Sequence, residues 1–193
     1  MPILRMILSM VLTLVSGATL AEPPAIDSPL PVLSITERGE LTMTGDDFNF
    51  VPWSSDNKPG KVRVIQYFGA TMGDSKVFEP FTDLLQTSLE PGAIHVTTIL
   101  NLDAALWGTT GFVVSELKKN KRIHPLATMV VDDEGTGVLE WGLGKAGTGL
   151  LVVDNKGIVK YFTPQSMSQE EMASTLQLLR TLSGSKGTPA VSR

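Results

Sequence analysis

The chain of 193 residues contains no cysteine, and this absence excludes a whole class of chemistry. Without a thiol the protein can form neither a mixed disulfide nor a sulfenic acid, so we expect no thiol–disulfide oxidoreductase and no thiol-peroxidase activity. The two histidines, His95 and His124, are separated in sequence and have no cysteine beside them, so they do not suggest a metal site. We therefore predict no metal, no cofactor and no catalytic residue.

Positive charge is also scarce. Lysine and arginine number 16 against 20 aspartate and glutamate residues, which gives a formal net charge of −4. Binding to a phosphate backbone needs a positive field, so nucleic acid is not an expected partner. The apolar share of 42% and the charged share of 19% are typical of a globular domain rather than a disordered chain.

The composition changes along the chain and divides it into segments. Residues 1–21 combine a basic residue at Arg5, an apolar run and small residues before a cleavage point after Ala21, which is the pattern of a secretory signal peptide. An uncleaved membrane anchor is the alternative, although the run is short for one. We predict export to the periplasm, an extended proline-rich lead-in at 22–32, one domain at 33–182 and a disordered tail at 183–193.

Hydrophobic periodicity predicts the elements of that domain. An apolar run at 62–68 indicates a buried strand, and a helix is expected from about Ser75, with a kink at Pro80. The order is β–α–β–α–β–β–α behind a small N-terminal β extension. This order is typical of an α/β, thioredoxin-like sandwich, a central mixed sheet with helices on both faces. The further elements are a hairpin or edge strands with a turn at 37–40, a strand from Phe48, a strand at 94–100, a helix at 111–121, and a helix that begins with a capping box at Ser168–Glu171.

Two segments have nearly the same sequence, VVDDEG at 130–135 and VVDNKG at 152–157. We predict a strand, an Asp-x-x-Gly turn and a second strand for each of them. The acidic run in the first segment lacks the spaced ligands of a calcium loop. The glycines of 142–147 match a dinucleotide fingerprint, but a strand follows them rather than a helix, so we predict a loop between strands.

The stretch from Lys61 to Ser88 resembles the strand, turn and helix that carry the Cys-x-x-Cys pair of thioredoxin-like proteins. Met72 and Ser75 stand at the two cysteine positions, and a basic residue and a proline follow at the matching offsets. Asp74 and Ser75 are predicted to cap the helix. Thr148 falls near the position of the family's cis-proline. The candidate binding residues are therefore Met72, Gly73, Asp74, Ser75, Lys76 and Thr148.

Several longer stretches are similar to the YtfJ family of exported proteins from Gram-negative bacteria. This resemblance implies a thioredoxin-like fold, a periplasmic location and no redox cysteine pair. A transcriptional-regulator label is attached to some members, but an acidic exported domain without a helix-turn-helix pattern argues against that role. The matching stretches are ITERGEL (35–41), the Trp53 segment, GKVRVIQ (60–66), GFVVSELKKNKRIHP (111–125), VVDDEGTGVLEWGL (130–143) and VVDNKGIVKY (152–161).

These observations favour a non-enzymatic binding or accessory module whose partner is a periplasmic protein or peptide. The alternatives are an enzyme with non-thiol chemistry at the turn from Met72 to Lys76 and, less favoured, a transcriptional regulator. No membrane association is expected after signal cleavage, and the sequence does not determine an oligomeric state. The three tryptophans, Trp53, Trp107 and Trp141, are expected in the core or at its rim. An exposed apolar patch near Met72 would favour binding, whereas a perturbed titratable group in a cleft there would favour an enzyme.

Overall fold

The structure is a computed structural model, which describes residues 21–57 and 60–184. The predicted signal peptide, apart from Ala21, and nearly all of the predicted tail lie outside the described residues. Within the described ranges, no helix is both long enough and apolar enough to cross a membrane.

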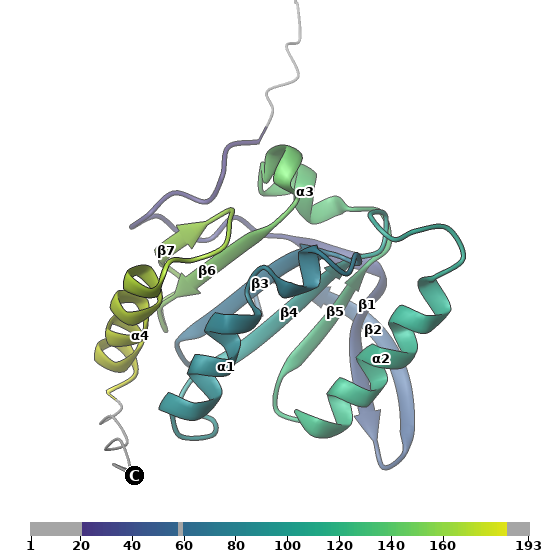
Figure 1. Cartoon of the computed structure of the whole chain (residues 1–193), viewed down its shortest axis with the longest axis horizontal. Coiled ribbons are helices and arrows are strands. Elements are labelled where there is room, and N and C mark those ends of the chain that lie inside the picture. Colours follow the sequence, from purple (N-terminus) through teal and green to yellow (C-terminus); the bar gives the residue numbers. More distant parts are fainter. Residues whose placement is uncertain (1–20, 58–59, 185–193) are drawn as a thin grey trace, which may run out of the picture.

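A single mixed sheet organises the molecule (Figure 1). Its seven strands lie in the order β2-β1-β5-β4-β3-β6-β7. The three central strands β3, β4 and β5 are parallel, and all other neighbours are antiparallel. The predicted α/β, thioredoxin-like architecture is confirmed, and the N-terminal extension joins the sheet through β1 and β5. The strands are β1 (Ser34–Thr44), β2 (Asp47–Ser54), β3 (Arg63–Gly69), β4 (His95–Asn101), β5 (Thr128–Asp132), β6 (Gly149–Val153) and β7 (Val159–Thr163).

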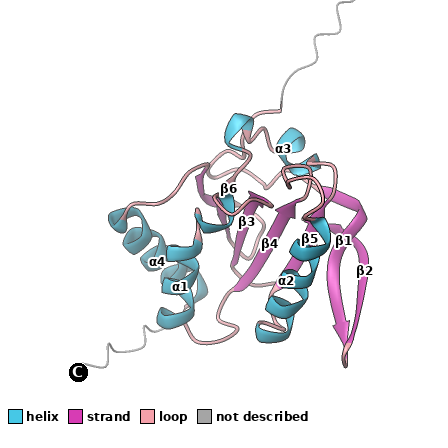
Figure 2. Ribbon diagram, turned by 45° about the vertical axis from the view of Figure 1, so that its right-hand side comes forward, coloured by secondary structure: helices cyan, strands magenta, loops and turns pink. Residues whose placement is uncertain are grey.

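Three helices cover one face of the sheet, as Figures 1 and 2 show. They are α1 (Glu79–Ser88), α2 (Thr110–Ile123) and α4 (Gln169–Ser183). Their apolar stripes pack on alternate strand residues, because successive side chains of a strand point to opposite faces. The buried residues of this face include Val64, Phe81, Leu85, Val152 and Leu179 under α1 and α4, and Leu100, Leu117 and Val131 under α2.

The opposite face is covered by the short helix α3 (Thr136–Glu140), the residues that follow it and the N-terminal lead-in. Trp141 and Tyr67 are both fully buried there and meet edge to face, with their ring centroids 6.5 Å apart. The indole Nε1 of Trp141 donates to the Pro31 carbonyl oxygen at 3.0 Å, which ties the lead-in to this face. Helices therefore lie on both faces, as the sequence predicts.

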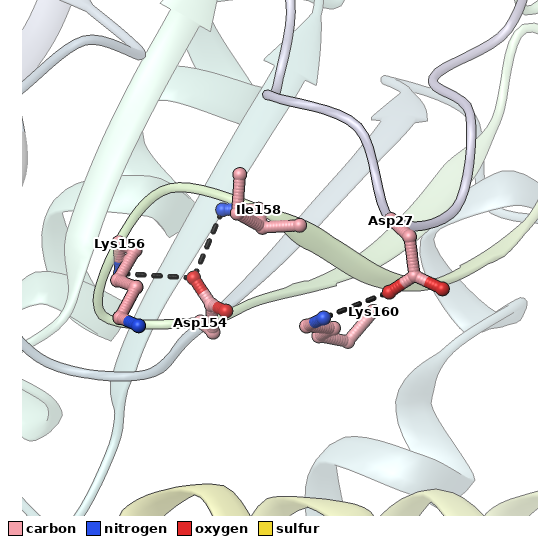
Figure 3. A network of polar contacts seen from close by, with 5 residues as sticks. All are labelled: Asp27, Asp154, Lys156, Ile158 and Lys160. Atoms are coloured by element: carbon pink, nitrogen blue, oxygen red, sulfur yellow. Dashed lines mark hydrogen bonds and ion pairs between the residues drawn. The ribbon is translucent and has the colours of Figure 1, made fainter.

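The lead-in and the β6–β7 hairpin are joined at the surface (Figure 3). Asp27 and Lys160 form an ion pair at 2.7 Å, and the Asp27 amide donates to the Val159 carbonyl oxygen at 2.8 Å. Within the hairpin turn, Asp154 Oδ1 accepts hydrogen bonds from the backbone amides of Lys156 and Ile158 at 2.8 and 2.9 Å. The second Asp-x-x-Gly segment is thus the predicted hairpin.

The first Asp-x-x-Gly segment is not a hairpin, and this part of the prediction is wrong. After β5 the chain enters α3 instead of a second strand. The Asp132 carboxylate is 1% exposed and accepts hydrogen bonds from the Tyr67 hydroxyl at 2.8 Å and from the amides of Thr136 and Gly137 at 3.0 and 2.8 Å. A carboxylate in that position satisfies two amides at the start of a helix, which otherwise lack partners.

Other local predictions also need correction. The turn after β3 that contains Met72, which we call the Met72 turn, leads into a 3₁₀ helix, η1 (Asp74–Lys76). Neither Asp74 nor Ser75 caps a helix with its side chain. Pro80 lies in the first turn of α1, where its missing amide hydrogen removes no helical bond, so it causes no kink. Residues 37–40 form an irregularity inside β1, and the chain reverses later, at Gly45.

Of the remaining local predictions, some are confirmed and one is wrong. The capping box is confirmed: Ser168 Oγ accepts from the Glu171 amide at 3.2 Å, and Glu171 Oε2 accepts from the Ser168 amide at 2.7 Å. The helix predicted at 111–121 is α2, although no side chain caps its start. The glycines of 142–147 connect α3 to β6 and include a second 3₁₀ helix, η2 (Gly144–Ala146), so they do not join two strands.

Candidate functional site

The loops after β3, β4 and β5 meet at one edge of the sheet, which we call the C-terminal edge. Because these strands are parallel, their carboxyl ends lie side by side. The Ala70 amide donates to the Asn101 carbonyl oxygen, and the Leu102 amide donates to the Asp132 carbonyl oxygen, both at 2.8 Å. The Met72 turn, the loop after β4 and α3 are therefore held next to one another, and α3 is visible above the sheet in Figure 1.

The Met72 turn is closed by hydrogen bonds of its own. Thr71 Oγ accepts from the Asp74 amide at 3.0 Å, and the Thr71 carbonyl oxygen accepts from the Ser75 amide at 3.1 Å. The Ser75 hydroxyl donates to the Met72 carbonyl oxygen at 3.2 Å. Gly73 and Met72 are exposed, and the Met72 side chain is 84% exposed. The turn that holds the redox pair in active thioredoxins thus presents a thioether to the solvent.

A cavity of about 380 Å³ opens at the C-terminal edge. The Asp74 carboxylate reaches over Gly69, where a Cβ atom would lie only 2.6 Å from Asp74 Oδ2. The absence of a side chain at Gly69 therefore lets this carboxylate face the cavity. The lining consists of Gly69, Asp74, Asn101, Asp103, Ala104, Glu134, Gly135, Val138, Leu139, Gly144, Lys145, Ala146 and Gly147.

The charges around this cavity are unbalanced. The residues that line it include three acidic ones, Asp74, Asp103 and Glu134, and one basic one, Lys145. Within the described part of the chain, none of the three carboxylates accepts a hydrogen bond or forms an ion pair. The loop that carries Asp103 is fixed by buried Asn101, whose Oδ1 accepts from the Asp103 amide at 2.9 Å. The cavity is therefore acidic and open to solvent.

Large apolar side chains are exposed along the same edge. Trp107 is fully exposed and Leu106 is 73% exposed, in the loop after β4. Phe112, in the first turn of α2, is 68% exposed, and Leu139 of α3 is 71% exposed and also lines the cavity. The prediction that the tryptophans lie in the core or at its rim is confirmed for Trp53 and Trp141 and is wrong for Trp107.

A second, shallower cavity of about 280 Å³ lies on the helix-covered face, at the start of α1. Ser75 and Lys76 contribute to its rim. At its floor the Thr82 hydroxyl donates to Gln66 Oε1 at 3.2 Å, and Gln66 Nε2 donates to Thr98 Oγ at 2.7 Å. These two hydrogen bonds occupy the amide oxygen and nitrogen of Gln66. We therefore interpret them as a structural link between β3, β4 and α1.

The structure separates Thr148 from the other candidate residues. Thr148 is 4% exposed, and its hydroxyl donates to the Pro164 carbonyl oxygen at 2.6 Å. It lines neither cavity, although its neighbour Gly147 lines the one that Asp74 faces. The hydroxyl of Thr148 is therefore positioned to fix the start of β6 beside this edge.

Two buried titratable groups have shifted pKa values. Burial, and then the neighbouring Asp132 carboxylate, raise the pKa of the Tyr67 hydroxyl. Burial and the nearby Arg63 lower the pKa of His95, whose Nε2 lies 3.0 Å from Thr128 Oγ. His95 is the first residue of β4, and His124 follows the end of α2, so both histidines lie at the opposite edge of the sheet. Among the described residues, no group of three or more His, Cys, Asp or Glu residues is placed to hold a metal ion.

The sequence pattern indicated one of the three loops of this edge and did not indicate the other two. The missed residues follow the carboxyl ends of β4 and β5, and loops at the carboxyl ends of parallel strands often carry the ligand sites of α/β proteins. That rule could have indicated them once the strand order was known. They are Asp103, Leu106, Trp107, Glu134, Leu139 and Lys145.

Comparison with solved structures supports the thioredoxin-like architecture. AhpC of Mycobacterium bovis superposes with a TM-score of 0.52 at 15% identity, over 89% of this chain and 99% of that one. A thioredoxin-like protein solved in its oxidized form superposes with a TM-score of 0.52 at 11% identity, over 80% of this chain and 96% of its own. Identities this low show a shared fold and carry no activity to this protein.

Comparison of sequences is more specific. The uncharacterized protein YtfJ of Escherichia coli K12 is 31% identical over 180 residues, 93% of this chain and 98% of its own length. An uncharacterized protein of Haemophilus influenzae is 30% identical over 168 residues, 86% of this chain and 91% of its own. A family model described as a bacterial protein of unknown function (YtfJ_HI0045) matches residues 25–182. Because the family model matches most of this chain and a relative is 31% identical over nearly its whole length, this chain belongs to the YtfJ family.

Proposed function

We propose that this protein is a non-enzymatic binding module that acts in the periplasm and holds a polypeptide partner at its C-terminal edge. The observation that carries this proposal is the exposure of Leu106 and Trp107, 73% and 101%, in the loop after β4, which begins beside the Met72 turn. Large apolar side chains gathered on one part of a surface are a frequent mark of a binding site. Covering them would gain about 25 cal/mol for each Å² of apolar surface removed from water.

The side chains of the Met72 turn favour binding over catalysis. Met72 has no proton to lose, and its flexible thioether suits an adaptable apolar contact. Ser75 would need a neighbouring base to act as a nucleophile, but its hydroxyl is hydrogen bonded to the Met72 carbonyl oxygen. The two histidines lie at the opposite edge of the sheet. An enzyme at this turn would therefore lack the usual means to activate Ser75.

A periplasmic role without thiol chemistry is part of the proposal. The basic, apolar and small residues of 1–21 support export, and the lack of cysteine supports a function other than thiol redox chemistry. Fractionation of cells that produce the full chain should place the protein in the periplasm with Glu22 at its N-terminus. Recovery of protein that retains Met1 in the cytoplasm would contradict this location.

The binding role is tested by capture of periplasmic proteins on the immobilised protein and on three variants, of which Leu106→Asp and Leu126→Asp are a matched pair. Leu106 and Leu126 are 73% and 72% exposed, but Leu126 follows α2 at the opposite edge of the sheet. We expect Leu106→Asp to lose partners that both the wild type and Leu126→Asp retain, because a charge in an apolar contact stays desolvated and unpaired. Met72→Asp should behave like Leu106→Asp. All three variants should keep the thermal stability of the wild type, because the substituted side chains are exposed. Equal capture by all four proteins would contradict a binding role for this edge.

A further inference from the structure

The acidic cavity at the C-terminal edge indicates the chemistry of the partner. We infer that the partner presents a lysine or arginine side chain flanked by apolar residues, with the cation in the cavity and the apolar neighbours over Leu139 and Leu106. This inference rests on the proposed function, because it specifies the occupant of the same edge.

The acidic residues of the cavity are complementary to a cationic side chain. Asp74, Asp103 and Glu134 line a concave surface with Lys145 as the one cation among the lining residues. Carboxylates that share a cavity repel one another, and the cavity shape concentrates their field, so a cationic group is attracted there. The volume of about 380 Å³ falls within the usual range for ligand pockets, about 300–1,000 Å³, and accommodates one long side chain.

The apolar surroundings distinguish a polypeptide from other cations. A metal ion or a small amine would leave Leu106, Trp107 and Leu139 exposed, at 73%, 101% and 71%. Among the described residues no cluster of acidic residues or histidines is arranged to hold a metal. A bilayer with anionic lipids would cover the apolar side chains, but its negative surface would repel the carboxylates around them. A basic residue between apolar residues is complementary to both features at once.

The experiment is the selection of peptides from a random library displayed on phage, using the purified wild-type protein. Each selected sequence is then synthesised in three forms, with arginine, glutamine or glutamate at the enriched basic position. Binding is followed through the change in tryptophan fluorescence, which we assign to exposed Trp107 because the buried Trp53 and Trp141 should contribute a constant signal. We expect an arginine peptide to bind about tenfold more tightly than the glutamine peptide and the glutamate peptide to bind most weakly. Added salt should reduce the preference.

Two pairs of variants separate the charge from the apolar contact. Asp103→Asn with Glu134→Gln should remove most of the preference for arginine. Asp46→Asn with Asp47→Asn removes the same charge at the tip of the β1–β2 hairpin, far from this edge in Figure 2, and should leave the preference intact. Leu106→Asp should weaken all three peptides together.

Each outcome has a defined meaning. If peptides are selected but show no preference for a basic residue, the inference is wrong and the binding function stands. The same conclusion follows if the preference exists but Asp103→Asn with Glu134→Gln leaves it unchanged. If the wild type enriches no peptide beyond the Leu106→Asp protein, the binding function itself is wrong. Leu106-dependent sedimentation with vesicles of phosphatidylethanolamine and phosphatidylglycerol would identify a membrane surface as the partner and would overturn the inference.

Discussion

The segments VVDDEG and VVDNKG have nearly the same sequence and different structures. After Asp154 the chain turns into the β6–β7 hairpin, and Asp154 accepts two backbone hydrogen bonds within its own turn. After Asp132 the chain enters α3, and Asp132 accepts two backbone hydrogen bonds at the helix start and a third from Tyr67, 65 residues away. The same aspartate therefore closes a local turn in one place and ties two distant elements together in the other.

The burial of the two carboxylates explains the difference. Asp132 is 1% exposed and lies beside the fully buried Tyr67, whereas Asp154 is half-buried at a surface turn. A buried carboxylate is stable only when donors surround it, and α3 supplies two of them. The turn before this helix carries Glu134 and the helix itself carries Leu139, and both residues line the cavity at the C-terminal edge. The first segment thus shapes the proposed binding surface, and the second holds the hairpin and the lead-in.

The largest difference is expected when each aspartate loses its carboxylate. Asp132→Ala leaves the Tyr67 hydroxyl and two amides without their charged acceptor, and it should lower the free energy of unfolding by about 3 kcal/mol or more. Asp154→Ala should lower it by about 1 kcal/mol, because water can reach its donors. Chemical denaturation at neutral pH measures both. Equal losses would show that the link to Tyr67 adds nothing to the local hydrogen bonds.

Glycine substitutions should give the next largest contrast. A Cβ atom at Gly137 would collide with the ring of buried Tyr67, and we expect Gly137→Ala to cost about 2–3 kcal/mol. Gly157, in the hairpin, has a φ of 85°, and Gly157→Ala should cost about 1–2 kcal/mol through backbone strain alone.

The two glycine substitutions differ in their coupling to Tyr67. Combining Gly137→Ala with Tyr67→Leu should cost less than the sum of the single changes, because the smaller side chain removes the collision. Combining Gly157→Ala with Tyr67→Leu should be additive. Additive losses for both pairs would indicate that α3 can move away from the sheet.

The stability of the protein at alkaline pH should depend on its two tyrosines, Tyr67 beside Asp132 and Tyr161 on β7. Burial raises the pKa of Tyr67 and of Tyr161 on β7, so the unfolded chain releases these protons first. Their contribution to stability is complete below the ordinary tyrosine pKa of about 10 and is lost as the pH rises above it, at up to about 1.4 kcal/mol per pH unit for each group.

The larger part of this loss should come from Tyr67, which lies beside the Asp132 carboxylate. Tyr67→Phe should therefore flatten the alkaline stability profile more than Tyr161→Phe. Ultraviolet absorbance of tyrosinate, recorded during denaturation, follows the titration. If both tyrosines ionise in the folded protein close to pH 10, burial does not raise their pKa values and this prediction is wrong.

The smallest effect is expected at the ion pair between the lead-in and β7. Asp27 is exposed, and exposed ion pairs contribute little to stability. Asp27→Asn should leave the thermal midpoint unchanged within error, because backbone hydrogen bonds also hold the lead-in against β7. A fall in the midpoint comparable to that of Asp154→Ala would show that charge, rather than the backbone, attaches this segment.

Sequence patterns predicted the architecture well where one stretch of chain contains all the necessary information. The β-branched run around Ile65 forms a buried strand because its side chains suit both faces of a sheet, and the capping box at Ser168 starts α4 through contacts three residues apart. The Met72 turn was recognised for the same reason, since its strand, turn and helix are consecutive. The helix caps were misplaced because Thr71, rather than Asp74, supplies the side-chain acceptor in that turn.

The candidate site depended on elements that are far apart in the chain. By itself the sequence determined that thiol chemistry is absent, that the chain folds as an α/β sheet, and that a degenerate redox turn follows the buried strand around Ile65. Only the tertiary structure decided that Asp74, Asp103 and Glu134 share one cavity, because the order of parallel strands brings three separate loops to one edge. It also decided that Asp132 starts a helix while Asp154 closes a hairpin. Local hydrogen bonds are the same in kind for both, and the buried Tyr67 hydroxyl, which only the folded chain places beside Asp132, distinguishes them.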